Sequence, residues 1–393
     1  VSDFPFGVPT QQMLRLTSHD PGRGPNEPCT PSVCAVFYFF IQAGWESSGQ
    51  VLRQPVRRTT LDYNVPRLYA HVVVDNQQFY AQVDTGSPEL TVIWKDWYEH
   101  VTHPGSCTTL QMGCYTCPKG CDSKPTIKIS YGFKEVSVFP WRGSVRLGDT
   151  VVGKLGFGVI KGQKPPPPSR NAANILGLSP DASKLPSVLT QLYGQSKVSS
   201  PTFALYLSRP SAGSFESSGE LLLGGGDDTL YVKPLRFVRF SKPAVLEVKL
   251  DSLKVGNGPS VARINQDLLI DTGTNFVLVP SKYIDSLLRS IQAEASKTAG
   301  RTVKFTFAPA SKVYLFDCAD AAFLPTITFA LGAVGEVQLT MDHAAYYHNL
   351  MNQCYIDIVS AEDNDWVLPD KTLYGNYLEF QPQNARLGIA KLK

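Results

Sequence analysis

The chain has 393 residues, of which 43% are hydrophobic and 18% are charged, and its formal net charge is +3. This composition excludes a wholly disordered protein, and the length suffices for two domains or one large bilobed unit with a substantial core. We find no dense lysine or arginine patch, so the small positive charge gives no reason to expect a nucleic-acid partner.

Residues 1–60 are rich in Pro, Gly, Ser and Arg and predict an N-terminal extension rather than part of the core. Within them, the apolar run VCAVFYFFIQAG begins at Val33. It is too short to span a bilayer, and it fits a signal-peptide core and a buried strand equally well. If the extension is a prosegment acting in cis, Arg53, Arg57 and Arg58 would face acidic groups in a cleft. The last residues, LGIAKLK, carry no hydrophobic tail, so we expect no membrane anchor.

From about Leu68 the chain changes to short apolar stretches separated by Gly, Pro, Asn and Asp, such as LYAHVVV, FYAQVD, TIKISYG and GELLLGG. Valine, isoleucine and aromatic residues dominate these stretches and often alternate with polar ones. The pattern predicts a mainly all-β protein with many short strands. Two segments, 184–195 and 281–297, have apolar residues at helical spacing, and Ser281 is the expected N-cap of the second.

The eight cysteines are even in number and partly clustered, which is compatible with disulfides and an oxidising compartment. The cluster of Cys107, Cys114, Cys117 and Cys121 could instead hold zinc through thiolates. However, it contains one Cys-x-x-Cys knuckle, whereas a zinc ribbon usually shows two. We therefore favour disulfides and expect no metal or other cofactor. The pairing within this cluster, and of Cys29 and Cys34, stays open.

Two distant stretches repeat one pattern: VDTGS begins at Val83, and IDTGT begins at Ile270. Each follows an apolar strand. In each, the glycine allows a tight turn or a close backbone approach, and the threonine hydroxyl can tie the turn to a neighbouring backbone. A single such turn is a common surface feature. Two of them, roughly one lobe apart, are much stronger evidence of a shared site.

Each half also has a later apolar stretch ending near leucine, NILGL at 174–178 and WVLPD at 366–370, so the chain resembles itself. Internal duplication predicts two similar β lobes, which we assign to residues 61–228 and 229–393. Pseudo-twofold packing of these lobes would bring the two Asp-Thr-Gly turns together.

In that arrangement Asp84 faces Asp271. Two carboxyl groups at contact distance cannot both ionise easily, so they share a proton and titrate in two separated steps. The ionised member can deprotonate a water molecule while the protonated member donates to a carbonyl oxygen. The pair therefore predicts general acid–base hydrolysis without a covalent enzyme intermediate.

Over roughly residues 66–393 the sequence resembles the pepsin-like, two-lobed aspartic proteases. The resemblance rests on QVDTGS, LLIDTGT, the flap-like ISYGFKEV at 129–136, NILGL, DCADAAFLPTITFAL and YGNYLEFQPQNARLGIA. It implies a mainly β, bilobed fold with a central cleft and an aspartic endopeptidase that cleaves extended polypeptides. It also implies a monomer of the secretory pathway, either secreted or held in an acidic vacuole-like compartment.

The resemblance assigns roles to individual residues. Asp84 and Asp271 would be the catalytic dyad, and Thr85 and Thr272 would lock the two loops across the pseudo-twofold. The implied substrate-binding residues are Gly86, Ser87, Tyr131, Gly132, Ile175, Gly273 and Thr274. Of these, Ser87 and Thr274 would donate hydrogen bonds to the outer oxygens of the dyad, Gly86 and Gly273 would let substrate approach, and Tyr131 and Gly132 would form the flap tip. A disulfide between Cys318 and Cys354 is also implied.

The sequence departs from the family pattern in three places. Thr91 stands where many members have a tryptophan that supports the flap, and Trp94 lies three residues further on. Pro369 replaces a glycine behind Asp271, which removes a backbone donor and is expected to alter that loop. The segment between Asp84 and the flap has four cysteines instead of two. These departures support an alternative, a catalytically silent peptide-binding or inhibitor protein, although binding alone does not need two apposed carboxylates.

Overall fold

The structure is a computed structural model that describes residues 51–62, 66–120, 124–132, 134–167, 172–180, 185–211, 214–261, 263–309, 312–350, 352–361 and 365–393. Ser48–Lys393 form one compact unit. Cys29, Cys34, Cys121 and the apolar run from Val33 lie outside the described residues, so the predictions for them stay predictions. In the part of the chain that is described, no helix combines the length and apolar character needed to cross a bilayer.

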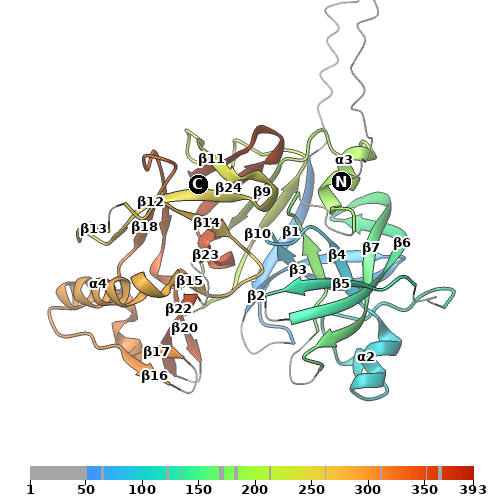
Figure 1. The fold of residues 1–393 in the computed structure, drawn as a ribbon, viewed down its shortest axis with the longest axis horizontal. Helices are drawn as coiled ribbons and strands as arrows, with labels where there is room; N and C mark the ends of the chain where they lie inside the picture. The colour runs from blue at the N-terminus through green and yellow to red at the C-terminus, as the bar shows by residue number, and fades with distance from the viewer. Residues whose placement is uncertain are drawn as a thin grey trace, which may run out of the picture. The chain divides into compact units, whose positions relative to one another are not determined.

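The prediction of a mainly β fold is confirmed (Figure 1). The N-terminal half contains the strands β1 (Leu52–Thr59), β2 (Arg67–Val74), β3 (Gln77–Asp84), β4 (Leu90–Ile93), β5 (Ile127–Tyr131), β6 (Lys134–Leu147), β7 (Thr150–Lys164), β8 (Ile175–Gly177), β9 (Phe203–Leu207) and β10 (Ser217–Leu223).

The C-terminal half contains β11 (Arg236–Lys242), β12 (Glu247–Val255), β13 (Ser260–Val261), β14 (Gln266–Ile270), β15 (Val277–Pro280), β16 (Thr306–Ala308), β17 (Val313–Phe316), β18 (Ile327–Leu331), β19 (Val337–Met341), β20 (Tyr347–Leu350), β21 (Gln353–Ile356), β22 (Ile358–Ala361), β23 (Trp366–Leu368), β24 (Asn376–Gln381) and β25 (Arg386–Lys391). Strands β16, β17, β21 and β20 form a separate four-stranded sheet, and the other strands belong to one large sheet.

Both predicted helices are present, as α3 (Val188–Gly194) and α4 (Ser281–Ala299). Leucine and isoleucine at helical spacing explain α4, because Leu287, Leu288 and Ile291 are all buried on one side. The N-cap prediction for Ser281 is wrong. Pro280 takes that position, and the Ser281 hydroxyl instead contacts the Ser360 hydroxyl at 2.8 Å.

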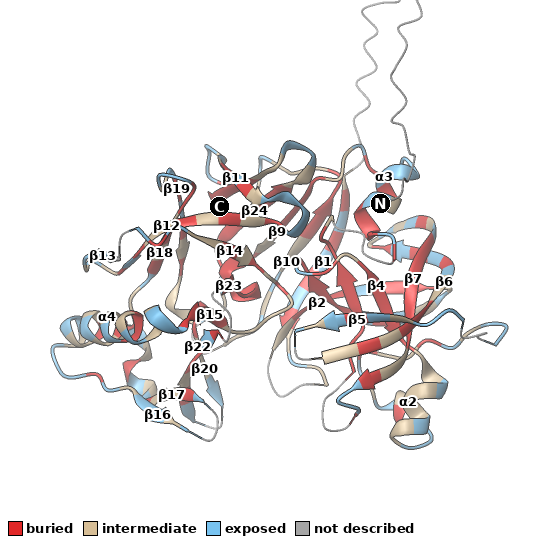
Figure 2. Cartoon of the chain, in the orientation of Figure 1, coloured by how far each residue is buried: buried red, intermediate tan, exposed pale blue. Residues whose placement is uncertain are grey.

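A third helix, α2 (Lys95–Val101), was not predicted, because its seven residues include none that is buried and so show no apolar stripe. Short 3₁₀ turns complete the elements: η1 (Ser106–Thr108), η2 (Pro243–Val245), η3 (Cys318–Phe323), η4 (His343–Ala345), η5 (Asp370–Leu373) and η6 (Pro382–Asn384). Figure 2 shows that buried residues concentrate in the strands, whereas α2 and α4 present exposed surfaces.

The two halves repeat one strand arrangement around each Asp-Thr-Gly turn. In the N-terminal half, β3 pairs in parallel with β8, and β4 pairs in parallel with β7. In the C-terminal half, β14 pairs in parallel with β23, and β15 pairs in parallel with β22. Each Asp-Thr-Gly turn therefore follows a central strand that pairs with a short apolar strand, as internal duplication predicts.

The halves also share a sheet. Its antiparallel strands run in the order β1, β10, β9, β24, β25 and β11, so strands near both ends of the chain pair with strands from its middle. Because β1 also pairs with β2 and β11 with β12, backbone hydrogen bonds connect this shared sheet to both duplicated arrangements.

The prediction that residues 1–60 form an extension is wrong for its last part. Residues Leu52–Thr59 are β1, which pairs with both β10 and β2. Leu52 and Val56 are core residues on its buried face. Arg58 points to the same side and is 3% exposed, so it does not cover a cleft as a prosegment side chain would.

We expect the position of β1 to define the shortest chain that folds. A chain starting at Leu61 loses the strand between β10 and β2, whereas one starting at Ser48 keeps it. Thermal unfolding should show a cooperative transition for the Ser48 chain and none for the Leu61 chain. Cooperative unfolding of both would contradict this role of β1.

Candidate active site

The two Asp-Thr-Gly turns interlock through their threonines. The Thr85 N–H donates to the Thr272 hydroxyl at 3.1 Å, and the Thr272 N–H donates to the Thr85 hydroxyl at 3.0 Å. Each hydroxyl then donates across to the opposite strand, from Thr85 to the Ile270 carbonyl at 2.6 Å and from Thr272 to the Val83 carbonyl at 2.8 Å. Both threonines are buried, so water does not compete for these bonds.

The glycines after the threonines allow the carboxyl groups to meet. A Cβ atom on Gly86 would lie 2.9 Å from the Asp271 carboxyl carbon. A Cβ atom on Gly273 would lie 2.6 Å from Asp84 Oδ1. Each carboxyl group therefore packs against the backbone of the opposite turn, and only glycine leaves room for it.

The two carboxyl groups accept partly different hydrogen bonds. Asp84 accepts from the Gly86 N–H at 2.8 Å and from the Ser87 hydroxyl at 2.6 Å, as predicted for Ser87. Asp271 accepts from the Gly273 N–H at 2.8 Å. Among the described residues, no hydrogen bond joins the Thr274 hydroxyl to this carboxyl group. Thr274 instead donates its N–H to the Asp271 backbone carbonyl at 3.2 Å.

The environment of Asp271 favours its protonated form. Burial raises the pKa of this carboxyl well above its ordinary value, and the adjacent charge of Asp84 raises it further. The Gly273 N–H acts in the opposite direction, and the charge of Asp370 adds to the increase. One of two neighbouring carboxyl groups is thus prepared to hold a proton.

The segment predicted to be the flap forms a hairpin of β5 and β6. Tyr131 pairs with Lys134 across its end, and Gly132 follows with the left-handed φ of 56°. The buried Tyr131 hydroxyl faces Thr91, the residue at the usual tryptophan position. Burial raises the pKa of Tyr131, an effect that the Thr91 hydroxyl opposes and the charges of Glu89 and Asp84 reinforce. Ile175 packs in the same apolar cluster as Tyr131.

Sequence reasoning missed Gln82, two residues before Asp84. Its side-chain amide donates to the Gly273 carbonyl at 2.6 Å, and its side-chain oxygen accepts from Arg67 at 3.1 Å. The signal that could have revealed it is a glutamine inside the apolar strand FYAQVD, because a buried polar side chain needs a partner.

Sequence reasoning also missed a group of buried charges behind Asp271. Asp370 and Lys371, which follow the apolar strand β23 after Pro369, are 0% and 1% exposed. Asp370 pairs with Arg58 from β1, and Lys371 pairs with Asp357. Pro369, which is expected from the sequence to alter this loop, is the N-cap of η5, the turn that contains both residues.

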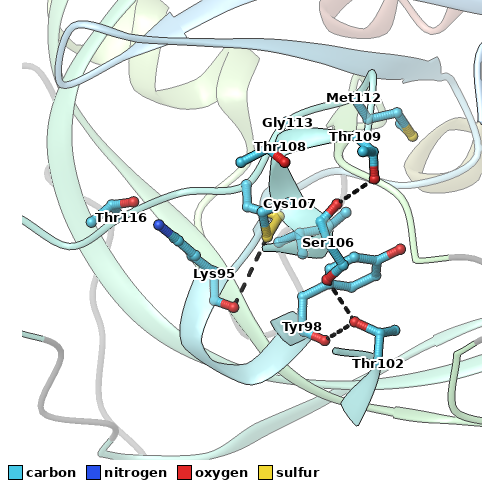
Figure 3. The surroundings of a disulfide bond; sticks show 12 residues. Lys95, Tyr98, Thr102, Ser106, Cys107, Thr108, Thr109, Met112, Gly113 and Thr116 are labelled. Carbon is cyan, nitrogen blue, oxygen red and sulfur yellow. Dashed lines mark hydrogen bonds between the residues drawn. A yellow bond between two sulfur atoms is a disulfide. The ribbon is translucent and has the colours of Figure 1, made fainter. Parts of the chain in front are cut away.

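Two disulfides have both of their cysteines among the described residues. The pair Cys318–Cys354, implied by the family resemblance, is confirmed. The second, Cys107–Cys114, closes the loop after α2 and agrees with the preference for disulfides over zinc (Figure 3). Around it, the Thr102 hydroxyl contacts the Ser106 hydroxyl at 2.7 Å. Cys117 is also disulfide-bonded.

We expect Gly273→Ala to reduce kcat/KM by about 10²-fold or more, because the new methyl group must displace the Asp84 carboxyl by a large part of an ångström. Steady-state kinetics on a peptide substrate measures this. Gly194→Ala is the matched control, since its Cβ would meet nothing within 4 Å and should leave kcat/KM unchanged. Equal kinetics for both variants would contradict the close approach.

Comparisons with known proteins agree with this geometry. The family model for eukaryotic aspartyl proteases matches residues 70–392. Cathepsin D of Clupea harengus is 26% identical over 338 residues, which cover 80% of this chain and 81% of the relative. Gastricsin of Mus musculus is 24% identical, with 80% and 77% covered, and renin of Echis ocellatus is 23% identical, with 85% and 86% covered. The chain therefore belongs to the eukaryotic aspartyl protease family and is an aspartic-type endopeptidase.

Proposed function

We propose that this endopeptidase hydrolyses peptide bonds with a water molecule activated between Asp84 and Asp271. The observation that carries the proposal is the pair of interlocked turns, which place each carboxyl group against the glycine of the opposite turn. Binding without catalysis would not need this apposition, because two carboxyl groups side by side cost free energy that a binding site could avoid.

The hydrogen bonds suggest different roles for the two acids. The Gly86 N–H and the Ser87 hydroxyl both donate to Asp84, so its carboxyl group is held in position to act as the general base. Asp271, with its raised pKa, is suited to hold the proton. Asp84 would take a proton from water as the oxygen attacks the peptide carbon, while Asp271 protonates the carbonyl oxygen. The resulting diol collapses when Asp84 protonates the amide nitrogen and Asp271 recovers a proton from a diol hydroxyl.

The substrate that fits this arrangement is an extended polypeptide. It would lie under the hairpin of β5 and β6, where Tyr131 and Gly132 form the tip, and would pair through its main chain as an added strand. Ile175 and Thr274 would contact its side chains or backbone. The reaction needs no cofactor, and the enzyme would act as a monomer. Its disulfides support the secretory pathway, with final delivery outside the cell or to an acidic vacuole-like compartment.

The proposed mechanism predicts cleavage that depends on acid. A carboxyl whose folded pKa is raised keeps its proton above its ordinary value of about 3.9, and loses it as the pH rises through the raised pKa. Activity should therefore be high in acid and fall on the alkaline side as Asp271 ionises. The measurement is kcat/KM on a denatured protein or peptide from pH 3 to 7, with and without a statine-type inhibitor.

The control is the same profile with inhibitors of serine and metal-dependent proteases, which should have no effect. Cleavage that the statine-type inhibitor abolishes would support the shared-proton mechanism. Peptide binding with no cleavage at any pH would favour the silent peptide-binding protein, with Thr91 and Pro369 as the first positions to examine.

A further inference from the structure

The loops that back the two catalytic turns are attached differently. Behind Asp84, consecutive backbone N–H groups donate to the turn and the residues that follow it. Gly177 donates to the Glu89 carbonyl at 3.0 Å, Leu178 to Asp84 at 2.8 Å, and Ser179 to Ser87 at 2.9 Å. Three backbone hydrogen bonds therefore hold the first catalytic turn from behind.

Pro369 occupies the place of Gly177 in the second half. The register shows this, because Val83 pairs with Leu176 as Ile270 pairs with Leu368. Proline has no N–H, so the first of the three bonds cannot form. The next N–H, of Asp370, reaches the Thr274 carbonyl only at 3.5 Å. The loop behind Asp271 is thus more weakly tied to its turn by the backbone.

A buried ion pair lies at the loop behind Asp271. Lys371 lies in η5, behind the turn, and its ammonium pairs with the carboxylate of Asp357. The side chains are 1% and 5% exposed. The backbone carbonyl of Asp357 accepts from the N–H of Val277 at 2.8 Å. Since Val277 begins β15, the strand that leaves the Asp271 turn, the pair connects the loop behind the turn with the strand after it.

The pair has a third member near the surface. His348 Nδ1 lies 2.5 Å from Asp357 Oδ1, and the His348 side chain is 20% exposed. The histidine ring stacks on Tyr355 with a centroid separation of 4.8 Å. Asp357 is therefore held between Lys371 and His348, with its carboxylate fixed on both sides.

The charges around this pair are balanced. Burial alone would raise the pKa of Asp357, but the charges and hydrogen bonds of Lys371 and His348 outweigh it, so the net shift is downward. Burial lowers the pKa of Lys371, and Arg58 lowers it further, whereas Asp357 and Asp370 oppose this change. The carboxylate and the ammonium each lie in the field of an opposite charge.

We propose that Lys371 and Asp357 are positioning residues for Asp271, and that their ion pair replaces the backbone attachment that Pro369 removes. The inference rests on the proposed function, because it assigns these residues to the alignment of the catalytic dyad. It also explains why two charges are buried behind one turn, whereas the matching loop behind the other turn carries Leu178 and Ser179.

The test compares Lys371→Met with Lys371→Met/Pro369→Gly in the full chain. Loss of the pair should lower kcat about 10- to 100-fold with KM nearly unchanged, because the dyad is misaligned while substrate contacts remain. Affinity for a statine-type inhibitor should fall in parallel. Glycine at 369 restores a backbone donor, so the double variant should recover part of both losses. Pro369→Gly alone should change neither.

Active sites are counted by inhibitor titration, so that kcat refers to folded enzyme. Lys233→Met is the matched control: it breaks an ion pair with Asp228 whose side chains are 66% and 60% exposed, and should leave kcat unchanged. If Lys371→Met does not fold, His348→Ala tests the same carboxylate from its exposed side. A smaller fall in kcat with unchanged KM is then expected.

Two results would overturn the inference. In the first, kcat per active site and inhibitor affinity stay at wild-type values in Lys371→Met, or in His348→Ala if that variant replaces it. In the second, Pro369→Gly fails to recover any of the loss. Failure of the proposed function is distinguishable, because the wild-type chain would then not cleave at all. Inhibitor affinity would still report whether Lys371 and Asp357 align the dyad.

Discussion

Replacing Asp271 with asparagine should lower kcat by about 10²- to 10⁴-fold or more while the chain stays folded, because the amide cannot hold the proton that the carbonyl oxygen needs. Asparagine has nearly the same shape, and it can still accept the hydrogen bond from the Gly273 N–H at 2.8 Å. The fold should even become slightly more stable at neutral pH, since the folded chain raises the pKa of the Asp271 carboxyl.

The sign of that stability change follows from linkage. A carboxyl whose folded pKa is raised opposes folding once the pH exceeds its ordinary value of about 3.9, and the penalty persists as the pH rises through the folded pKa. Removing the ionisable group removes the penalty. Thermal unfolding at pH 7 should therefore show an equal or higher Tm for Asp271→Asn, beside single-turnover kinetics that show the loss of cleavage.

Two variants serve as controls for this experiment. Asp84→Asn removes the proposed general base and should be as inactive as Asp271→Asn. Asp149→Asn changes an exposed carboxyl in the turn between β6 and β7 and should cleave like the wild type. Retention of more than a tenth of wild-type kcat in Asp271→Asn would rule out its role as the proton donor.

Arg58→Met should be among the most destabilising single substitutions in the chain. The guanidinium is 3% exposed and donates to Asp370 at 2.9 Å, to the Phe215 carbonyl at 2.9 Å and to the Pro66 carbonyl at 3.0 Å. Removing it leaves the fully buried Asp370 without its opposite charge. Breaking a buried pair in this way typically costs about 3–5 kcal/mol. Chemical denaturation at pH 7 gives the free energy of unfolding.

The same strand provides the matched control. Arg53 pairs with Glu220 and Asp227, but its side chain is 44% exposed. Exposed pairs contribute about 0–1 kcal/mol, so Arg53→Met should change stability by no more than that. Equal losses for the two variants would contradict the burial argument.

The cost of Arg58→Met should also depend on pH. Burial raises the pKa of Asp370 even with Arg58 present, and Arg58 is the largest influence that opposes this rise. Without Arg58 the carboxyl should protonate at a higher pH, which removes its charge. The destabilisation should therefore shrink as the pH falls, and it should nearly vanish in the double variant Arg58→Met/Asp370→Leu, where both charges are gone.

Local sequence carried enough information to predict the centre of the site. Asp84 and Asp271 each follow an apolar strand and precede Thr-Gly. Five consecutive residues therefore contain the pattern that predicts a catalytic carboxyl group. A tight turn needs its glycine, and a carboxyl dyad needs two copies of the Asp-Thr-Gly motif. Both features can be recognised in the amino-acid sequence. The alternation of apolar and polar residues similarly indicated the β fold, because the period of two is a local property of strands.

Long-range contacts could not be predicted in this way. Nothing near Arg58 in the sequence shows that its partner is Asp370. The basic segment around Arg58 has the composition of a solvated extension, and only the structure shows that it forms β1 between β10 and β2. For the same reason Gln82 looked like an ordinary strand residue, and Thr274 looked like a partner of the Asp271 carboxyl. Hydrogen bonds across the pseudo-twofold depend on distances between segments, which sequence spacing does not report.

Short motifs in the amino-acid sequence alone therefore predict the two carboxyl groups and the flap, and the family resemblance implies the Cys318–Cys354 pair. The tertiary structure adds the support of the dyad: interlocked threonines, the Arg58–Asp370 pair and the Lys371–Asp357 pair. The physical reason is that a buried charge is tolerated only where the fold brings an opposite charge to it. Such a pairing depends on how the whole chain packs.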